Sequence, residues 1–273
     1  MFLKFVNNDL TVSTVSNVYL EKSFDQGLWH QPDRFGYEAL AATFIPLLLE
    51  HSNIETETPF RFTRFQMERL QIPDQNCTGC SWEEFLEPNQ TVVTLADLFQ
   101  QHLGYPLQKM LNRLSSAKKG IMYLAEETAE ITGLEMFPEY LTLLFEIDSL
   151  VLNMNRKLNN ICVLEQNGKY DYCPIFGLRA ALMSSVVVFP MSVHPIRMVN
   201  GQYAEPFNIT FNGQVHTAQN LYGKQLRIPR FTYDELMEKL PPLLEYYTPR
   251  NHDQIATRVC YTICTRQKSL KSN

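Results

Sequence analysis

The sequence contains no apolar run that approaches the roughly 20 residues needed to cross a membrane as a helix. Its longest mainly apolar run, Ala180–Phe189, has the length of a strand or a short helix. The first ten residues also lack the long apolar segment and the small-residue cleavage site of a secretory signal. We therefore expect a soluble cytoplasmic protein with no membrane partner.

Several short motifs of common enzyme classes are also missing. No G-x-x-x-x-G-K-[ST], G-x-G-x-x-G or G-x-S-x-G pattern occurs, which argues against a P-loop enzyme, a Rossmann dehydrogenase and an α/β-hydrolase. The six histidines are scattered, without a His-x-x-x-His or His-Cys cluster. Hydrolytic and ordinary nucleotide-binding motifs therefore give no lead.

Cysteine is sparse, and its six copies fall in three pairs along the chain. Cys77 and Cys80 have the spacing of zinc ligands, but a structural zinc site needs four ligands, commonly from two such pairs. In a cytosolic chain, buried reduced thiols are the better interpretation. We expect no metal site, and keep a redox or metal module built on Cys77 and Cys80 as a third hypothesis.

The composition itself is that of a globular protein. The chain has 273 residues, of which 45% are hydrophobic and 12% aromatic, enough for one large domain or two packed lobes. Its net charge of -5 argues against broad binding to a phosphate backbone, so we expect no direct nucleic-acid partner.

Hydrophobic periodicity divides the chain into two parts. Residues 1–32 alternate apolar and polar side chains, as short strands do, and Gly36–Asn53 has helical spacing. Alternation returns over Pro59–Leu70, and Cys77–Pro88 is expected to be irregular. We predict a small β-rich N-terminal lobe with one long helix over residues 1–92, and a larger, mainly helical lobe over residues 93–273.

The larger part contains a hairpin among its helices. Its sequence predicts helices over 94–103, 108–114, 118–132, 139–152, 233–247 (interrupted by two prolines) and 253–266. Two strands, 161–164 and 170–176, are joined by Gln166-Asn-Gly168, a strong hairpin signal. The order is therefore a buried helix, a polar loop, a hairpin and a short helix.

Kinase-fold proteins assemble a phosphoryl-transfer site from this order of elements. Asp148–Ser185 resembles the core of the HipA-like serine/threonine kinases, whose loop reads N-x-D-R-H-x-x-N and whose hairpin ends in P-I-F-D and, two residues on, Gly. Arg34–Asn53 is similar to the first-lobe helix of that family, GCSWEEFL (residues 79–86) to its GCxSxNFL segment, and residues 132–150 to its long helix. The resemblance covers about four fifths of the chain and implies an α+β, two-lobed HipA/protein-kinase-like fold.

The departures from the family pattern concern the groups that do the chemistry. Asn155 stands in place of the catalytic aspartate, and an amide cannot take a proton from a substrate hydroxyl. Gly177 replaces the metal-binding aspartate after P-I-F, so magnesium loses its main anchor. Asn153, Arg156 and Asn160 are retained.

Positive charge gathers at the altered positions. Lys157 replaces the histidine of the loop, and Arg179 follows the hairpin; they could oppose phosphates in place of a metal, or fill the cleft and exclude nucleotide. Where relatives have a nucleotide-contacting lysine, this chain has Gln31 or His30, unless a gap places Lys22 there. Glu38 is either a helix-dipole charge or the remnant of a lysine–glutamate pair.

A simpler interpretation applies to the loop, because its asparagines suit turns and local hydrogen bonds. Asp148 projects from the apolar face of its helix, and a buried carboxylate needs partners. We therefore expect Asp148 to brace the loop rather than to react.

The resemblance leads to two main hypotheses. The first is a pseudokinase that acts as a binding or regulatory protein, with an antitoxin-like repressor or a related kinase as its partner. The second is an atypical active kinase or nucleotide-dependent transferase that uses Arg156, Asn160 and one of the acids Asp148, Asp171 and Glu38. ATP is the candidate cofactor of both, with weak or absent magnesium dependence in the first.

Overall fold

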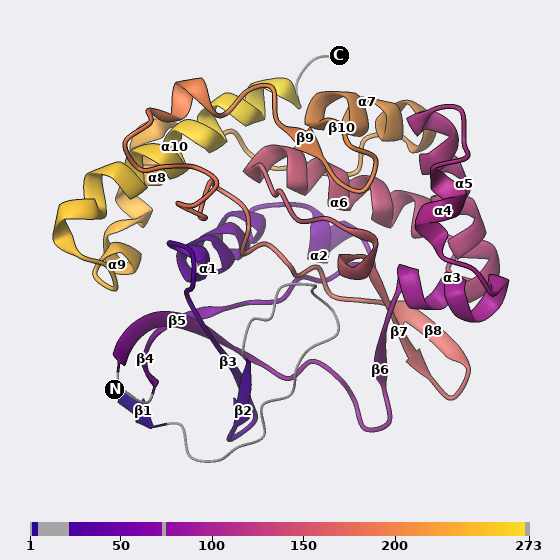
Figure 1. Ribbon diagram of the computed structural model, residues 1–273, viewed down its shortest axis with the longest axis horizontal. Coiled ribbons are helices and arrows are strands. Elements are labelled where there is room, and N and C mark those ends of the chain that lie inside the picture. Colours follow the sequence, from indigo (N-terminus) through magenta and orange to yellow (C-terminus); the bar gives the residue numbers. More distant parts are fainter. Residues whose placement is uncertain (1, 5–21, 73–74, 271–273) are drawn as a thin grey trace.

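The protein consists of two lobes stacked on each other. The computed structural model describes residues 2–4, 22–72 and 75–270. Figure 1 shows a twisted sheet in the lower half, a group of helices in the upper half, and α1 (Glu38–Leu49) between them. Much of the alternating pattern expected over residues 1–32 falls on residues 5–21, outside the described residues.

The smaller lobe is built on a five-stranded sheet. Its strands are β1 (Phe2–Lys4), β2 (Ser23–Asp25), β3 (Leu28–Pro32), β4 (Gln66–Ile72) and β5 (Gln75–Glu83), in the order β1-β4-β5-β3-β2. β1 runs parallel to β4, and the other neighbours are antiparallel.

The central strand β5 corrects the sequence prediction, which expected Cys77–Pro88 to be irregular. The strand is rich in small and polar residues of low strand propensity, and Gly79–Trp82 are all buried, so no alternation of apolar and polar residues marked it. A Cβ atom on Gly79 would lie 2.7 Å from the carbonyl oxygen of Gln31, so the glycine permits close approach of β3.

α1 packs its small residues onto β4 and β5, and only Leu47 in it is exposed. A short helix, α2 (Ile54–Glu57), follows. The strand expected over Pro59–Leu70 begins only at Gln66, because Phe60 and Phe62 are buried in an extended segment outside the sheet. Phe62 forms an isolated parallel bridge with Ile175 of the larger lobe.

The larger lobe is arranged around α6 (Phe137–Val151), which contacts α5, α7 and α10. Its other helices are α3 (Leu95–Leu103), α4 (Leu107–Leu111), α5 (Ala117–Thr132), α7 (Phe211–Tyr222), α8 (Tyr233–Lys239), α9 (Pro241–Leu244) and α10 (His252–Ser269). The predicted helices are confirmed, although α4 ends earlier than expected. α7 was not predicted, because Asn212 and Gly213 in its first turn are poor helix formers.

The predicted hairpin is confirmed as β7 (Cys162–Gln166) and β8 (Lys169–Tyr172), joined by Asn167 and Gly168 with φ of 55° and 78°. Its second strand ends at Tyr172, shorter than expected. β6 (Thr91–Thr94) adds a third strand by pairing with β7. β9 (Tyr203–Ala204) and β10 (Ile209–Thr210) form a separate small ladder.

Two buried arginines of α10 hold distant segments. Arg258 donates to the carbonyl oxygens of Phe189, Pro190 and Val193. Arg266 donates to Ser149 at the end of α6 and to the side-chain oxygen of Asn212 at the start of α7. Each buried guanidinium is thus supplied with several oxygen acceptors, which offset the cost of burying its charge.

Between the lobes the chain runs through residues 84–90 into β6. The boundary expected between residues 92 and 93 lies within β6, and the division at that position stays a prediction. In the described part of the chain, no helix is both long and apolar enough to cross a membrane.

Candidate functional site

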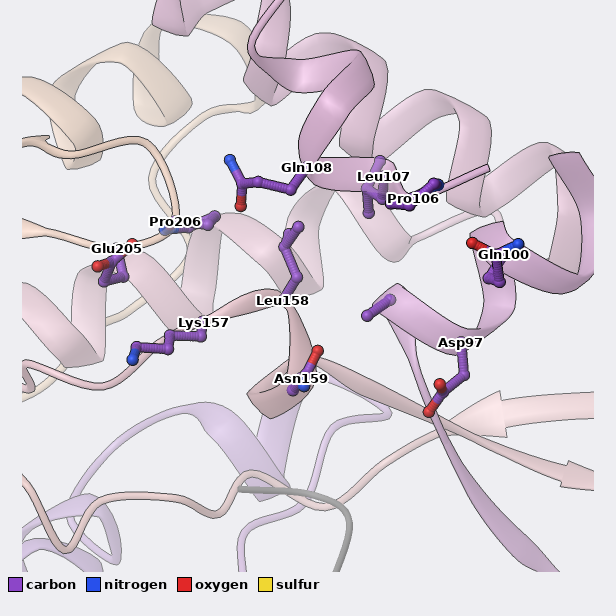
Figure 2. A pocket seen from close by; sticks show the side chains of 11 residues that line it. Asp97, Gln100, Pro106, Leu107, Gln108, Lys157, Leu158, Asn159, Glu205 and Pro206 are labelled. Carbon is purple, nitrogen blue, oxygen red and sulfur yellow. The ribbon is translucent and has the colours of Figure 1, made fainter. Parts of the chain in front are cut away.

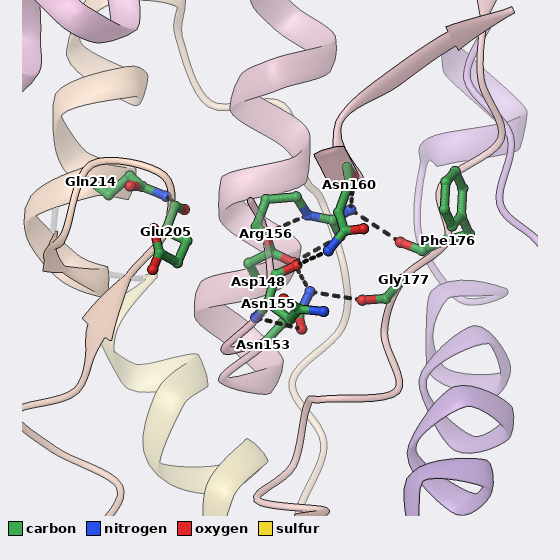
Figure 3. A network of polar contacts seen from close by, with 9 residues as sticks. All are labelled: Asp148, Asn153, Asn155, Arg156, Asn160, Phe176, Gly177, Glu205 and Gln214. Atoms are coloured by element: carbon green, nitrogen blue, oxygen red, sulfur yellow. Dashed lines mark hydrogen bonds and ion pairs between the residues drawn. The ribbon is translucent and has the colours of Figure 1, made fainter. Parts of the chain in front are cut away.

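The polar loop after α6 is organised by an ion pair between Asp148 and Arg156. The carboxylate of Asp148 receives hydrogen bonds from Arg156 Nε at 2.8 Å and from Arg156 Nη2 at 2.9 Å (Figure 3). Both side chains are at most 2% exposed. This two-point contact fixes the orientation of the guanidinium as well as its charge.

The same arginine ties the loop to the end of the hairpin. Arg156 Nη1 donates to the carbonyl oxygens of Asn160 at 3.0 Å and Phe176 at 3.1 Å. Asn153 Nδ2 donates to Asp148 at 2.7 Å and to the carbonyl of Gly177 at 3.2 Å. The loop and the hairpin end, which lie far apart in sequence, therefore form one connected network.

Asn160 closes the loop on itself. Its side-chain nitrogen donates to the carbonyl oxygen of Asn155 at 2.7 Å. The backbone N–H of Asn155 contacts the side-chain oxygen of Asn153 at 3.4 Å. The network brings together the predicted site residues Asn153, Asn155, Arg156, Asn160 and Gly177, and its hydrogen bonds brace the loop. Asp148 has the bracing contacts that its position in the sequence indicated.

Gly177 occupies a backbone conformation that favours glycine, with φ of +76°. A Cβ atom there would lie 3.6 Å from Arg156 Nη1, so the space is sufficient and the restriction is conformational. An aspartate at this position would be strained in the present backbone.

Arg179 reaches out of the larger lobe into the smaller one. Its Nη1 contacts the Cys80 sulfur at 2.9 Å, and its Nη2 donates to the carbonyl of Pro32 at 2.7 Å. Nη2 also lies 3.4 Å from the carboxylate of Asp33. The guanidinium is thus engaged in contacts between the two lobes, and its role toward a nucleotide stays a prediction.

Asp33 is the acid that meets this cation, and the sequence analysis did not single it out. It accepts hydrogen bonds from the Tyr247 hydroxyl at 2.6 Å and from the N–H of Ala39 at 2.5 Å. Burial raises the pKa of Asp33 to about 7, although Arg179 acts in the opposite direction. The carboxyl therefore titrates near neutral pH, in a contact between the lobes.

Lys22 brings a second cation to the same region. Its ammonium lies 5.2 Å from the centre of the Trp82 ring. Burial lowers the pKa of Lys22, and the charge of Arg179 lowers it further. Lys22 therefore lies close enough to Arg179 for their charges to interact, and the assignment of Gln31, His30 or Lys22 to the nucleotide-contacting position stays a prediction.

The other first-lobe candidates have local partners. Gln31 is buried in β3 opposite Cys80, and His30 lies 2.9 Å from the carboxylate of Glu68. Glu38 accepts the N–H of Phe35 at 2.6 Å in the first turn of α1, the position of a helix-dipole charge. Its second oxygen is buried without a hydrogen-bond partner.

Close backbone contact also joins the lobes beside this cluster. Gly36 forms a bridge with Ser185, and the N–H of Tyr37 donates to the carbonyl of Ser184 at 3.1 Å. A Cβ atom on Gly36 would lie 2.0 Å from that carbonyl oxygen. The absence of a side chain at Gly36 is therefore a condition for this approach.

The cleft can be tested for the groups that a kinase would hold. Phosphate oxygens suit the ammonium of Lys22, whereas the guanidinium of Arg179 is engaged by Cys80, Pro32 and Asp33 and its Nε is buried without a hydrogen-bond partner. Magnesium requires carboxylate or similar oxygens, and Asn155 and Gly177 supply no carboxylate. Across the described residues no three His, Cys, Asp or Glu side chains gather as metal ligands. The residues fit a nucleotide phosphate better than a metal ion.

Lys157 lies apart from this cluster. Its side chain is exposed and lines a pocket bounded by α3, α4 and residues 205–206 (Figure 2). Asp171, one of the acids considered for an active enzyme, is exposed on β8 and accepts the N–H of Tyr172. The structure thus brings Arg179 and Glu38 to the Asp33 cluster and leaves Lys157 and Asp171 outside it.

Comparisons with known proteins add a fold but no family. No protein-family model matches the chain, and no curated protein matches it. Among solved structures it is similar to the crystal structure of CtkA, a proinflammatory kinase of Helicobacter pylori. The TM-score is 0.56, the identity is 12%, and the match covers 97% of this chain and 96% of that chain. The predicted fold class is confirmed: the chain has an α+β, two-lobed kinase-like fold, with a β-sheet lobe followed by a mostly helical part.

Proposed function

We propose that this chain is a HipA-like pseudokinase, a kinase fold that binds and regulates a partner without transferring phosphate. One observation carries the proposal: Arg179 spans the cleft and contacts Pro32, Cys80 and Asp33 of the smaller lobe. In the HipA-like pattern a glycine stands at the position of Arg179. A small residue that leaves the cleft open is thus replaced by a large cation that joins its two sides.

The chemistry of the loop supports the same proposal. Asn155 cannot accept a proton from a hydroxyl, and Gly177 has no side chain with which to hold a metal. The structural parts of the loop remain, since Asp148 and Arg156 form their buried pair. The reacting groups are therefore lost, while the Asp148–Arg156 pair that holds the loop is kept. This combination suits a protein that uses a kinase fold for binding.

ATP is the cofactor that the cleft suits best, held through Lys22 with weak or absent magnesium dependence. Lys22 is partly buried, and burial together with the charge of Arg179 lowers the pKa of its ammonium. An anionic ligand would offset the repulsion between these two cations. Arg179 limits such binding, because it occupies the cleft in the closed arrangement.

The resemblance to HipA-like kinases also suggests the kind of partner, an antitoxin-like repressor or a related kinase in the cytoplasm. The acidic net charge of -5 is consistent with a protein partner rather than a nucleic acid.

A thermal-shift titration tests the proposal. Purified protein is titrated with ATP, with and without magnesium, and its melting temperature is followed together with transfer of labelled phosphate. A ligand that binds the folded state raises the melting temperature. We expect a small shift that is independent of magnesium and no transfer; magnesium-dependent transfer would rule out the pseudokinase.

A triple reversion gives the sharper test. Asn155→Asp, Gly177→Asp and Arg179→Gly together restore the base, the metal ligand and the open cleft. The positive φ of Gly177 makes the second change strained, so melting temperatures of all variants are compared first. If the triple variant transfers phosphate and the natural chain does not, the result supports the proposal that the kinase fold is intact and only the catalytic groups have been lost.

An atypical enzyme remains the second candidate because of Asp33. A carboxyl whose pKa is raised to about 7 by burial has the acidity of a general base that operates at neutral pH. If Asp33 reacts, Asp33→Asn abolishes a transfer activity that the natural chain displays. Under the pseudokinase proposal, neither protein transfers phosphate.

A further inference from the structure

A pocket of about 490 Å³ lies beside the loop that follows α6. Its walls are α3, the start of α4, the loop residues Lys157–Asn159, and Glu205 with Pro206. This volume lies in the range of sites that hold small ligands or a few residues of a peptide. The pocket shares the loop with the kinase-like site but none of the groups that face the smaller lobe.

The pocket has an apolar middle and polar ends. Figure 2 shows Gln108 of α4 facing Leu158 of the loop, with Pro206 beside them. Lys157 and Glu205 lie at one end, and Asp97 and Gln100 at the other. A ligand that fills it therefore meets aliphatic carbon in the centre and polar groups on both sides.

The polar groups at the end of the pocket formed by Lys157 and Glu205 are available to a ligand. Within the described residues, neither Lys157 nor the carboxylate of Glu205 has an ion-pair or hydrogen-bond partner, whereas Arg156 next to Lys157 has every contact made internally. The backbone carbonyl of Glu205 is held by Gln214 Nε2 at 2.9 Å, which fixes that wall. At the other end the carboxylate of Asp97 accepts a hydrogen bond from the nearby Thr94 hydroxyl at 2.7 Å.

Charge and shape together select the ligand. Two carboxylates, Asp97 and Glu205, stand against one ammonium, Lys157, so a cationic group is favoured. The side-chain amides of Gln100 and Asn159 can bond the peptide groups of an extended chain. The central Leu158 and Pro206 suit an aliphatic side chain.

We propose that this pocket binds a short segment of a partner protein in which a basic side chain adjoins an aliphatic one. The inference rests on the proposed function only in taking the ligand to be a protein, and it places the contact outside the nucleotide cleft. Because Lys157 and Leu158 belong to the braced loop, an occupant touches that loop directly.

Two short peptides serve as probes, acetyl-Leu-Arg-Leu-amide and its acidic counterpart acetyl-Leu-Glu-Leu-amide. Each is titrated into the full chain, to 10 mM, while the methyl NMR signals of Ala96 and Leu158 are followed. We expect the basic peptide to shift both signals and the acidic peptide to leave them unchanged. No nucleotide is present, so the result is independent of whether the chain binds ATP or transfers phosphate.

Variants then locate the binding. Ala96→Phe fills the pocket from α3, and Ala117→Phe makes the same change at a half-buried helical alanine elsewhere. The first abolishes binding and the second preserves it. Glu205→Gln weakens the basic peptide about two- to fivefold, the effect of one exposed ion pair. Circular dichroism melts test whether each variant is folded. If Ala96→Phe does not fold, the affinity of Glu205→Gln for the basic peptide tests the proposal by itself.

Three results would overturn the proposal. Absence of any methyl shift at 10 mM excludes a peptide site, and equal binding of both peptides excludes the charge preference. Binding that survives Ala96→Phe and Glu205→Gln alike places the peptide elsewhere. If the pocket instead takes a free small molecule, both peptides fail while phosphate-transfer and ATP results stay as the pseudokinase requires.

Discussion

Arg179 Nη2 lies 3.4 Å from the carboxylate of Asp33, and this contact joins a loop of the larger lobe to the segment that precedes α1. The guanidinium therefore holds the two sides of the cleft together. Under the proposed function, we expect release of this contact to favour nucleotide binding.

Arg179→Ala is expected to increase the stabilisation by ATP. At a ligand concentration 100 times the dissociation constant, binding to the folded state contributes about 2.7 kcal/mol. The melting temperature with and without ATP is compared for Arg179→Ala, the natural chain and Arg64→Ala, which removes an exposed arginine. An ATP shift that is smaller in Arg179→Ala than in the natural chain would mean that Arg179 binds the nucleotide.

Asp148→Ala is expected to lower the free energy of unfolding by about 3–5 kcal/mol, because it leaves the buried charge of Arg156 unpaired. The matched control is Glu55→Ala, which breaks an ion pair with Arg64 at the surface and costs at most about 1 kcal/mol. Urea denaturation measures both. Equal costs would show that the Asp148–Arg156 pair does not brace the loop.

Asp33 is expected to make stability depend on pH. Its pKa is about 7 in the folded protein against 3.8 without burial, so between these values the folded chain holds a proton that the unfolded chain has lost. Stability contributed by this proton is present below about pH 4 and is lost as the pH rises through 7.

The measurement compares the natural chain with Asp33→Asn. The difference between their free energies of unfolding, natural minus variant, falls from pH 5 to pH 8, because the amide does not titrate. Groups that titrate equally in both proteins cancel. A difference that stays constant over this range would place the pKa of Asp33 in the folded protein below it.

Gly36→Ala is expected to destabilise the contact between the lobes. The added methyl would lie 2.0 Å from the Ser184 carbonyl oxygen, so the backbones must separate, at a cost of about 1–3 kcal/mol. Gly213→Ala is the control, because there the methyl lies 3.0 Å from the Thr210 hydroxyl at the start of α7. Urea denaturation that finds no difference between them would contradict the close approach.

The elements that the sequence predicted well are those whose signal is local. α6 shows a broad apolar face, and the hairpin has its Asn167-Gly168 turn. β5 was missed because its small and polar residues gain meaning only when β3 and β4 lie on either side. Its position in the centre of the sheet comes from tertiary pairing rather than from propensity.

In the candidate site, too, the residues that lie close together in sequence were predicted and those that lie far apart were not. Asp148, Asn153, Arg156 and Asn160 lie within thirteen residues, so one loop motif was enough to predict that they meet. The contact of Arg179 with Asp33 spans 146 positions of the chain, and Tyr247 joins Asp33 across 214. Such a cluster leaves no local pattern, so nothing in the sequence singled out Asp33.

The two buried arginines of α10 connect that helix to two distant segments of the chain. Arg258 and Arg266 are eight residues apart, which is about 12 Å along the helix axis. One anchors the segment around Phe189 and Pro190, and the other anchors the end of α6, from which the braced loop departs. α10 therefore connects the segment around Phe189 and Pro190 to the end of α6, so that the two segments share one rigid support.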